Sequence, residues 1–87
     1  MIKVGVIGAK GKMGSQVVQT VLNDPNLELI CAIDKFGCNE KINNIVIQDN
    51  LEKTLQETKP DIVVDFTQPS VIFENIKIYQ KNNIKSA

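Results

Sequence analysis

The fold is decided by residues 4–14, which read VGVIGAKGKMG. The start of this stretch is apolar and rich in β-branched side chains, which predicts a short buried strand ending at Gly8. A helix is expected to begin near Lys12, because apolar side chains recur on one helical face: Met13, Val17, Val18, Val21 and Leu22. Glycines between the two elements permit a tight turn and close packing of the helix on the sheet.

The spacing of these glycines indicates a site for an anionic ligand. Gly8, Gly11 and Gly14 form a G-x-x-G-x-x-G pattern, with Ala9 at the first glycine position of the commoner G-x-G-x-x-G. Backbone N–H groups at the helix start, with the positive end of its dipole, favour a pyrophosphate. Asp34 follows Gly14 by 20 residues, the spacing of a carboxylate that binds the adenine ribose. We therefore predict dinucleotide binding, the alternative being a purely structural turn.

Two neighbouring charges bear on which dinucleotide is preferred. The Asp34 carboxylate suits the 2′-hydroxyl of NADH and repels the 2′-phosphate of NADPH. Lys35, the next residue, is expected to offset part of that repulsion, although it also fits a solvated loop charge. The sequence thus predicts that NADH is bound at least as well as NADPH.

The rest of the chain alternates strand and helix patterns. Strands are expected at residues 27–33, 45–47 and 62–66, and the beginning of another at 84–87. Residues 35–44 are interpreted as a polar loop. Asp49-Asn50 are expected to cap a short helix carrying Leu51 and Leu55. A second helix is expected from residues 67–70 onward, carrying Val71, Ile72, Ile76 and Tyr79. This order predicts an α/β fold: a Rossmann-like, doubly wound parallel sheet, incomplete, with about four strands plus the start of another.

Composition limits the classes of partner. Ten basic and ten acidic residues give a net charge of zero, which argues against nucleic acid and anionic membranes. Cys31 lies in an apolar run and is interpreted as a buried reduced thiol, consistent with a cytoplasmic location. Cys38 lies in a polar loop, and without any histidine in the chain we expect no metal site.

A second motif follows the strand at 62–66. Asp65-Phe66-Thr67-Gln68-Pro69 lies at the carboxyl end of that strand, the edge where open α/β sheets bind ligands. Phe66 and Thr67 are expected to approach the nicotinamide end of the cofactor. For Asp65 we favour a structural role, in which its carboxylate caps backbone groups.

The glycine loop, the strand ending Ala32-Ile33-Asp34 and the Asp65–Pro69 motif together resemble the dihydrodipicolinate reductase family over the whole chain. The resemblance implies an NAD(P)H-dependent oxidoreductase of lysine and diaminopimelate biosynthesis. Its members reduce the product of dihydrodipicolinate synthase to tetrahydrodipicolinate, and are usually tetramers joined through a C-terminal domain. It also implies a pyrophosphate loop of Gly8, Ala9, Lys10, Gly11, Lys12 and Met13. Asp34 would meet the ribose, Lys35 a 2′-phosphate, and Phe66 and Thr67 the nicotinamide.

The chain departs from the family in two respects. The loop after Asp34 is shorter than usual, and the chain stops before the Gly-Thr-Thr-Gly turn, the substrate domain and the catalytic residues. We therefore expect residues 1–87 to be a partial dinucleotide-binding domain without catalytic residues, inactive alone and self-associating through an exposed sheet edge. The alternatives are another dehydrogenase, such as homoserine or aspartate-semialdehyde dehydrogenase, or a nucleotide- or coenzyme A-sensing module.

Overall fold

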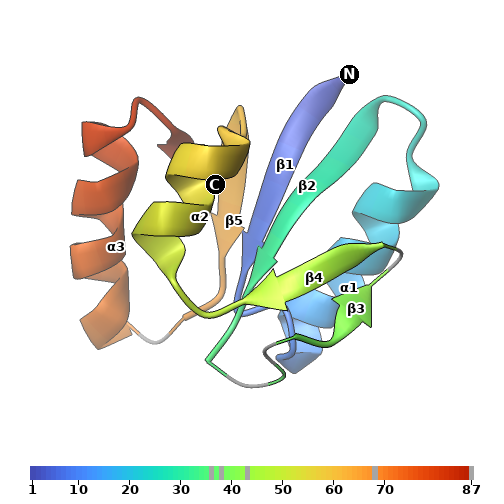
Figure 1. Cartoon of the computed structure of the whole chain (residues 1–87), viewed down its shortest axis with the longest axis horizontal. Coiled ribbons are helices and arrows are strands. Elements are labelled where there is room, and N and C mark those ends of the chain that lie inside the picture. The colour runs from blue at the N-terminus through green and yellow to red at the C-terminus, as the bar shows by residue number, and fades with distance from the viewer. Residues whose placement is uncertain (36, 38, 43, 68, 87) are drawn as a thin grey trace.

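The computed structural model describes residues 1–35, 37, 39–42, 44–67 and 69–86, and is built around one sheet of six strands in the order β3-β4-β2-β1-β5-β6 (Figure 1). The strands are β1 (Ile2–Ile7), β2 (Leu27–Ile33), β3 (Lys41–Ile42), β4 (Ile45–Gln48), β5 (Ile62–Asp65) and β6 (Lys85–Ser86). The helices are α1 (Lys12–Asn23), α2 (Leu51–Thr58) and α3 (Pro69–Lys81). Every strand pair is parallel except β3 with β4.

The predicted doubly wound α/β class is confirmed, with three local corrections. The polar-loop interpretation of residues 35–44 is wrong at Lys41–Ile42, which form β3 antiparallel to β4, with Ile42 opposite Ile45. A two-residue strand is too short to produce an alternation that a sequence pattern can reveal. The last strand begins at Lys85 rather than Ile84. Met13 is 56% exposed instead of lying on the packed face of its helix, because it belongs to the first turn of α1.

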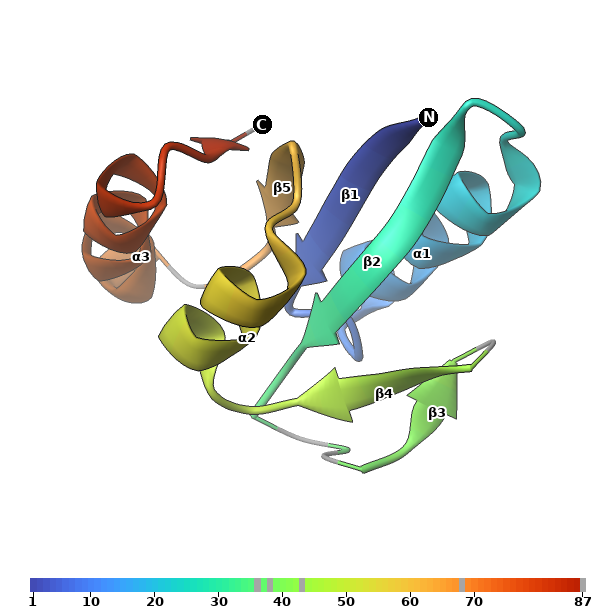
Figure 2. The same cartoon turned by 45° about the horizontal axis from the view of Figure 1, so that its top comes forward.

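Helices cover both faces of the sheet. Helix α1 lies on one face, whereas α2 and α3 lie on the other (Figures 1 and 2). Each face has its own buried cluster. The first contains Val18 and Val21 of α1 packed on strand residues that include Val6 and Ala32. The second contains Leu55 of α2 and Tyr79 of α3 packed on strand residues that include Ile33.

A bulge in β2 places Leu29 and Cys31 on opposite faces of the sheet. Val4 pairs with Leu29 and Gly5 pairs with Cys31, so Ile30 is an extra residue in β2. The insertion moves Cys31 to the α2–α3 face, while Leu29 packs with the α1 cluster. Cys31 is therefore buried and unpaired, as predicted, and burial raises the pKa of its thiol. Cys38 lies outside the described residues.

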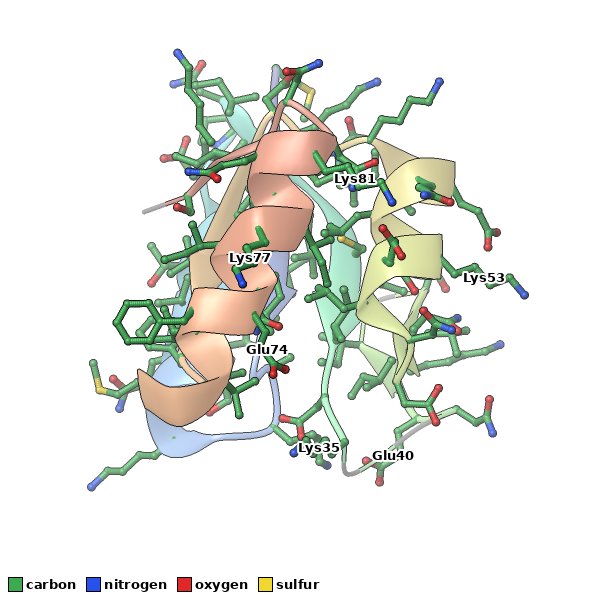
Figure 3. The ribbon with its side chains drawn as sticks, turned by 90° about the vertical axis from the view of Figure 1, so that its left-hand side faces the viewer. Lys35, Glu40, Lys53, Glu74, Lys77 and Lys81 are labelled. Carbon is green, nitrogen blue, oxygen red and sulfur yellow. The ribbon has the colours of Figure 1, made fainter. Side chains whose placement is uncertain are left out.

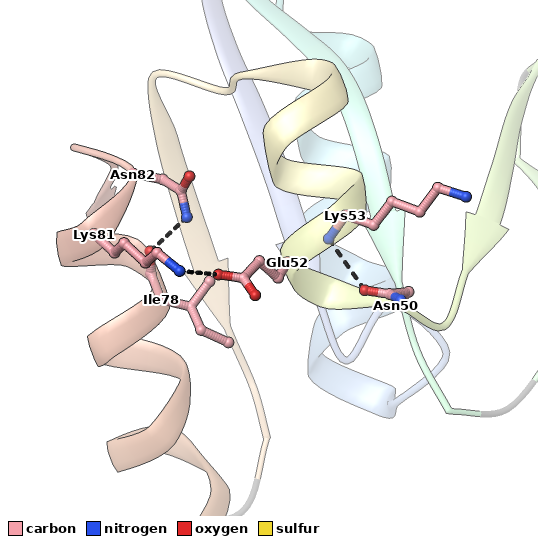
Figure 4. A network of polar contacts seen from close by, with 6 residues as sticks. All are labelled: Asn50, Glu52, Lys53, Ile78, Lys81 and Asn82. Carbon is pink, nitrogen blue, oxygen red and sulfur yellow. Dashed lines mark hydrogen bonds and ion pairs between the residues drawn. The ribbon is translucent and has the colours of Figure 1, made fainter.

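The start of α2 is capped as the sequence predicts. The Asn50 side chain accepts a hydrogen bond from the Lys53 backbone N–H at 3.1 Å (Figure 4). On the outer surface, Lys81 Nζ of α3 lies 3.2 Å from Glu52 Oε2 of α2, an exposed ion pair between the two helices. None of the helices in the described part of the chain has the length and apolar content needed to cross a bilayer.

Candidate functional site

The glycine loop is fastened to the carboxyl end of β2. The backbone N–H groups of Gly8 and Ala9 both donate to the Ile33 carbonyl oxygen, at 2.7 and 3.2 Å. Gly8 has φ of +82°, in the left-handed region where a residue without a Cβ is favoured. The chain therefore turns sharply at the sheet edge and enters α1 four residues later, at Lys12.

Gly14 allows the first turn of α1 to pack directly on this loop. A Cβ at position 14 would lie only 2.0 Å from the Gly8 carbonyl oxygen and 2.9 Å from the Gly8 carbonyl carbon. At Gly11, by contrast, the nearest atom to a Cβ would be the same oxygen at 3.3 Å. The third glycine is thus required for close helix packing, whereas the second lies at the helix entrance.

The entrance of α1 suits an anion. Gly11 is its N-cap residue and provides no side-chain hydrogen bond, and the fully described first turn of α1 contains no acidic residue. The start of α2 differs, because Asn50 caps it and Glu52 lies in its first turn. The first N–H groups of a helix have no partner within the helix. Those of α1 consequently present a positive edge that fits the pyrophosphate of a dinucleotide.

Asp34 lies directly against this loop. Its Oδ2 accepts a hydrogen bond from the Lys10 backbone N–H at 2.8 Å, and its own N–H donates to the Gln48 carbonyl oxygen at 2.9 Å. The carboxylate is therefore fixed between the loop after β1 and the end of β4. This is the position expected of an acidic residue that binds a ribose.

One cleft of about 790 Å³ joins the loops at this edge of the sheet. Seven of the residues predicted from sequence line it: Gly8, Lys10, Gly11, Asp34, Lys35, Phe66 and Thr67. The other three lie elsewhere: Ala9 is buried in the α1 cluster, and Lys12 and Met13 are exposed at the helix start.

The sequence reasoning missed three lining residues with functional side chains or contact surface: Asp49, Val71 and Asn75. Asp49 directly follows β4, so the rule that ligands bind at the carboxyl ends of parallel strands would have found it. For Asp49 the sequence predicts only a part in the cap of the following helix. Val71 and Asn75 lie on α3, and apolar periodicity there gave no sign that the helix faces the cleft.

Asp65 joins the end of β5 to α3. Its Oδ1 accepts from the Thr67 backbone N–H at 2.8 Å and from the Thr67 hydroxyl at 2.6 Å. Its Oδ2 accepts from Asn75 Nδ2 at 2.9 Å and from the Tyr79 hydroxyl at 2.5 Å. The expected capping of backbone by Asp65 is confirmed, and the same carboxylate holds two α3 side chains.

The charges of this network follow from its contacts. Burial acts to raise the pKa of Asp65, but the hydrogen bonds from Thr67, Tyr79 and Asn75 outweigh it and lower the pKa below its ordinary value. Burial, followed by the neighbouring Asp65 carboxylate, raises the pKa of Tyr79 far above its ordinary value. Asp65 is thus ionised and Tyr79 is a permanent donor, so the turn that carries Phe66 and Thr67 into the cleft is firmly held.

Comparison with known proteins points to one family. The sequence model of "Dihydrodipicolinate reductase, N-terminus" matches residues 2–86. The 4-hydroxy-tetrahydrodipicolinate reductase of Listeria monocytogenes serotype 4b is 39% identical over 93 residues, covering 98% of this chain and 35% of that protein. The reductase of the same name from Methanocaldococcus jannaschii is 36% identical over 99 residues, covering 97% of this chain and 35% of that protein.

A solved structure agrees with the sequence matches. The dipicolinate-bound dihydrodipicolinate reductase from Paenisporosarcina sp. TG-14 has a TM-score of 0.87 and 32% identity, covering 99% of this chain and 36% of that one. The chain therefore spans about a third of the length of the proteins that it matches.

Proposed function

The chain belongs to the dihydrodipicolinate reductase family, and we propose that it binds the adenosine diphosphate half of NADH or NADPH in the cleft at the carboxyl edge of its sheet. Residues 1–87 would constitute part of the nucleotide-binding domain of a reductase that acts on the product of dihydrodipicolinate synthase. A bound nicotinamide would supply the hydride for that reduction. The residues of this chain would bind and orient the cofactor.

One observation carries the proposal: the Asp34 carboxylate accepts a hydrogen bond from the Lys10 backbone N–H, two residues before the uncapped helix α1 begins at Lys12. A dinucleotide needs a cationic edge for its pyrophosphate and, next to it, an acceptor for its ribose hydroxyls. Gly8 and Gly11 leave the backbone accessible beside the edge for the pyrophosphate, and Asp34 provides the acceptor for the ribose hydroxyls. Phe66 and Thr67 line the same cleft and are proposed to face the nicotinamide side.

Calorimetric titration of the chain with NADH, NADPH and coenzyme A tests this proposal. We expect both dinucleotides to bind and coenzyme A not to bind. Gly11→Glu should abolish binding, because it places a carboxylate at the helix entrance. Asp34→Ala should weaken NADH binding about tenfold, the value of one hydrogen bond to a charged group.

Asp61→Ala is the matched control for Asp34→Ala. Asp61 Oδ2 also accepts a backbone N–H, from Lys3 at 2.9 Å, but it precedes β5 and so lies at the opposite edge of the sheet. NADH affinity should therefore be unchanged. If coenzyme A bound and neither dinucleotide did, a sensing function would replace the proposed reductase function. If the two aspartate variants weakened NADH binding equally, Asp34 would not be part of the binding site.

We further propose a preference for NADH that Lys35 moderates. Asp34 repels a 2′-phosphate, and Lys35, exposed at the rim of the cleft, offsets part of that repulsion (Figure 3). Lys35→Ala should weaken NADPH binding by about threefold, as expected for one exposed charge pair, and leave NADH binding unchanged. Lys53→Ala removes an exposed lysine on α2 and serves as control. An unchanged NADPH affinity in Lys35→Ala would assign Lys35 to the solvated surface.

Self-association through the β6 edge stays a prediction.

A further inference from the structure

Lys10, within the glycine loop, forms an ion pair with Glu40, an acidic residue outside the sequence motifs. Lys10 Nζ lies 2.6 Å from Glu40 Oε2. The two side chains come from different loops, after β1 and after β2, so the pair joins the glycine loop to the segment that precedes β3. Lys10 also lines the cleft with Asp34 and Lys35.

Glu40 is held in place by the backbone. Its carbonyl oxygen accepts the Ile47 N–H of β4 at 2.8 Å, and its own N–H donates to the Gly37 carbonyl oxygen at 3.0 Å. The Lys10 backbone is fixed as well, by its hydrogen bond to Asp34. The ion pair therefore joins two side chains that each extend from hydrogen-bonded backbone.

Gly37 shows that the pair is closely packed. It has φ of +74°, and a Cβ there would lie 2.4 Å from Glu40 Oε2 and 2.9 Å from Lys10 Cδ and Cε. The aliphatic part of Lys10 accordingly lies across Gly37 with its ammonium on Glu40. Figure 3 shows Lys35 and Glu40 at the same end of the molecule.

On the basis of the proposed dinucleotide site, we propose that Glu40 is a specificity-determining residue that disfavours NADPH by holding the Lys10 ammonium. The Lys10 backbone is hydrogen-bonded to Asp34, so its side chain originates beside the ribose site. A released ammonium there would attract a 2′-phosphate. Paired with Glu40 it is neutralised, and NADH, which lacks that phosphate, is unaffected.

Glu40→Gln tests this inference in calorimetric titrations with NADH and NADPH. The ratio of NADPH to NADH affinity should rise about threefold, the effect expected of one exposed ion pair. The gain should shrink at roughly 0.5 M salt, where exposed charges are largely screened. In a Lys10→Met background, where the stem remains but the charge is lost, Glu40→Gln should have no effect on the ratio.

Glu52→Gln is the matched control, because it breaks a second exposed ion pair among the described residues, with Lys81, on the outer surface of α2 and α3 (Figure 4). It should leave the ratio unchanged. If NADH binds and Glu40→Gln leaves the ratio unchanged, or if the gain persists without the Lys10 charge, the role of Glu40 is refuted and the cofactor site remains. If neither dinucleotide binds to the unmodified chain, both the site and the role of Glu40 are refuted.

Discussion

Replacing Gly14 by alanine is expected to abolish NADH binding and to lower the free energy of unfolding by about 3 kcal/mol, the upper range for overpacking. The added methyl would meet the Gly8 carbonyl at 2.0 Å, and this oxygen belongs to backbone rather than to a movable side chain. The loop would have to separate from α1, which also separates the helix entrance from Asp34. Urea unfolding followed by circular dichroism, together with NADH titration, measures both effects.

Gly11→Ala is the matched control for the loss of stability. A Cβ at Gly11 would be 3.3 Å from the same oxygen, and its φ of −68° suits any residue. Its cost should be about 1 kcal/mol, the loss of a favourable N-cap residue. If Gly14→Ala were as stable as Gly11→Ala, close contact between the glycine loop and α1 would be disproved.

The glycine loop and its surroundings were predictable because local chemistry determines them. Two glycines between a strand and a helix, with a third in the first helical turn, have few other arrangements. An aspartate after the next parallel strand must reach the same sheet edge. The structure accordingly brings Gly8, Gly11 and Asp34 to one cleft. The cap of α2 at Asn50 was predictable for the same reason, since it depends on residues adjacent in sequence.

The features that sequence did not reveal depend on contacts between distant segments. Asn75 faces Asp65 because α3 packs back on β5, and no periodicity specifies which polar residue meets the carboxylate. Glu40 reaches Lys10 through a turn at Gly37, just before the short strand β3, in a segment whose sequence predicts only a polar loop. Helical periodicity also assigns Met13 to the apolar face of its helix, because it does not distinguish a first turn beyond the sheet from the turns packed on it.

The second large effect is expected at Asp65, whose replacement by alanine should lower the free energy of unfolding by about 3 kcal/mol. The change removes the acceptor of the Tyr79 hydroxyl and the nearer acceptor of the Asn75 amide, which keeps only the Thr67 hydroxyl at 3.4 Å. Tyr79 and Asn75 are only 1% and 7% exposed. A buried donor left without an acceptor costs about 1–3 kcal/mol. Tyr79→Phe removes one donor and leaves the carboxylate satisfied by the others, so its cost should be nearer 1 kcal/mol. Equal costs for the two variants in urea unfolding would show that Asp65 is not the centre of the network.

The same carboxylate predicts a difference in acid stability between the unmodified chain and Asp65→Asn. Because the folded pKa of Asp65 is lowered, its contribution is fully present above its ordinary pKa of 3.8 and is lost as the pH falls through the folded value. The difference in unfolding free energy should be constant from about pH 5 to 8 and shrink below about pH 4. Other carboxylates titrate in both chains and cancel in this comparison. A difference that stayed constant in acid would mean that Asp65 is not stabilised as an anion, and that neutral hydrogen bonding suffices to hold the turn that carries Phe66 and Thr67.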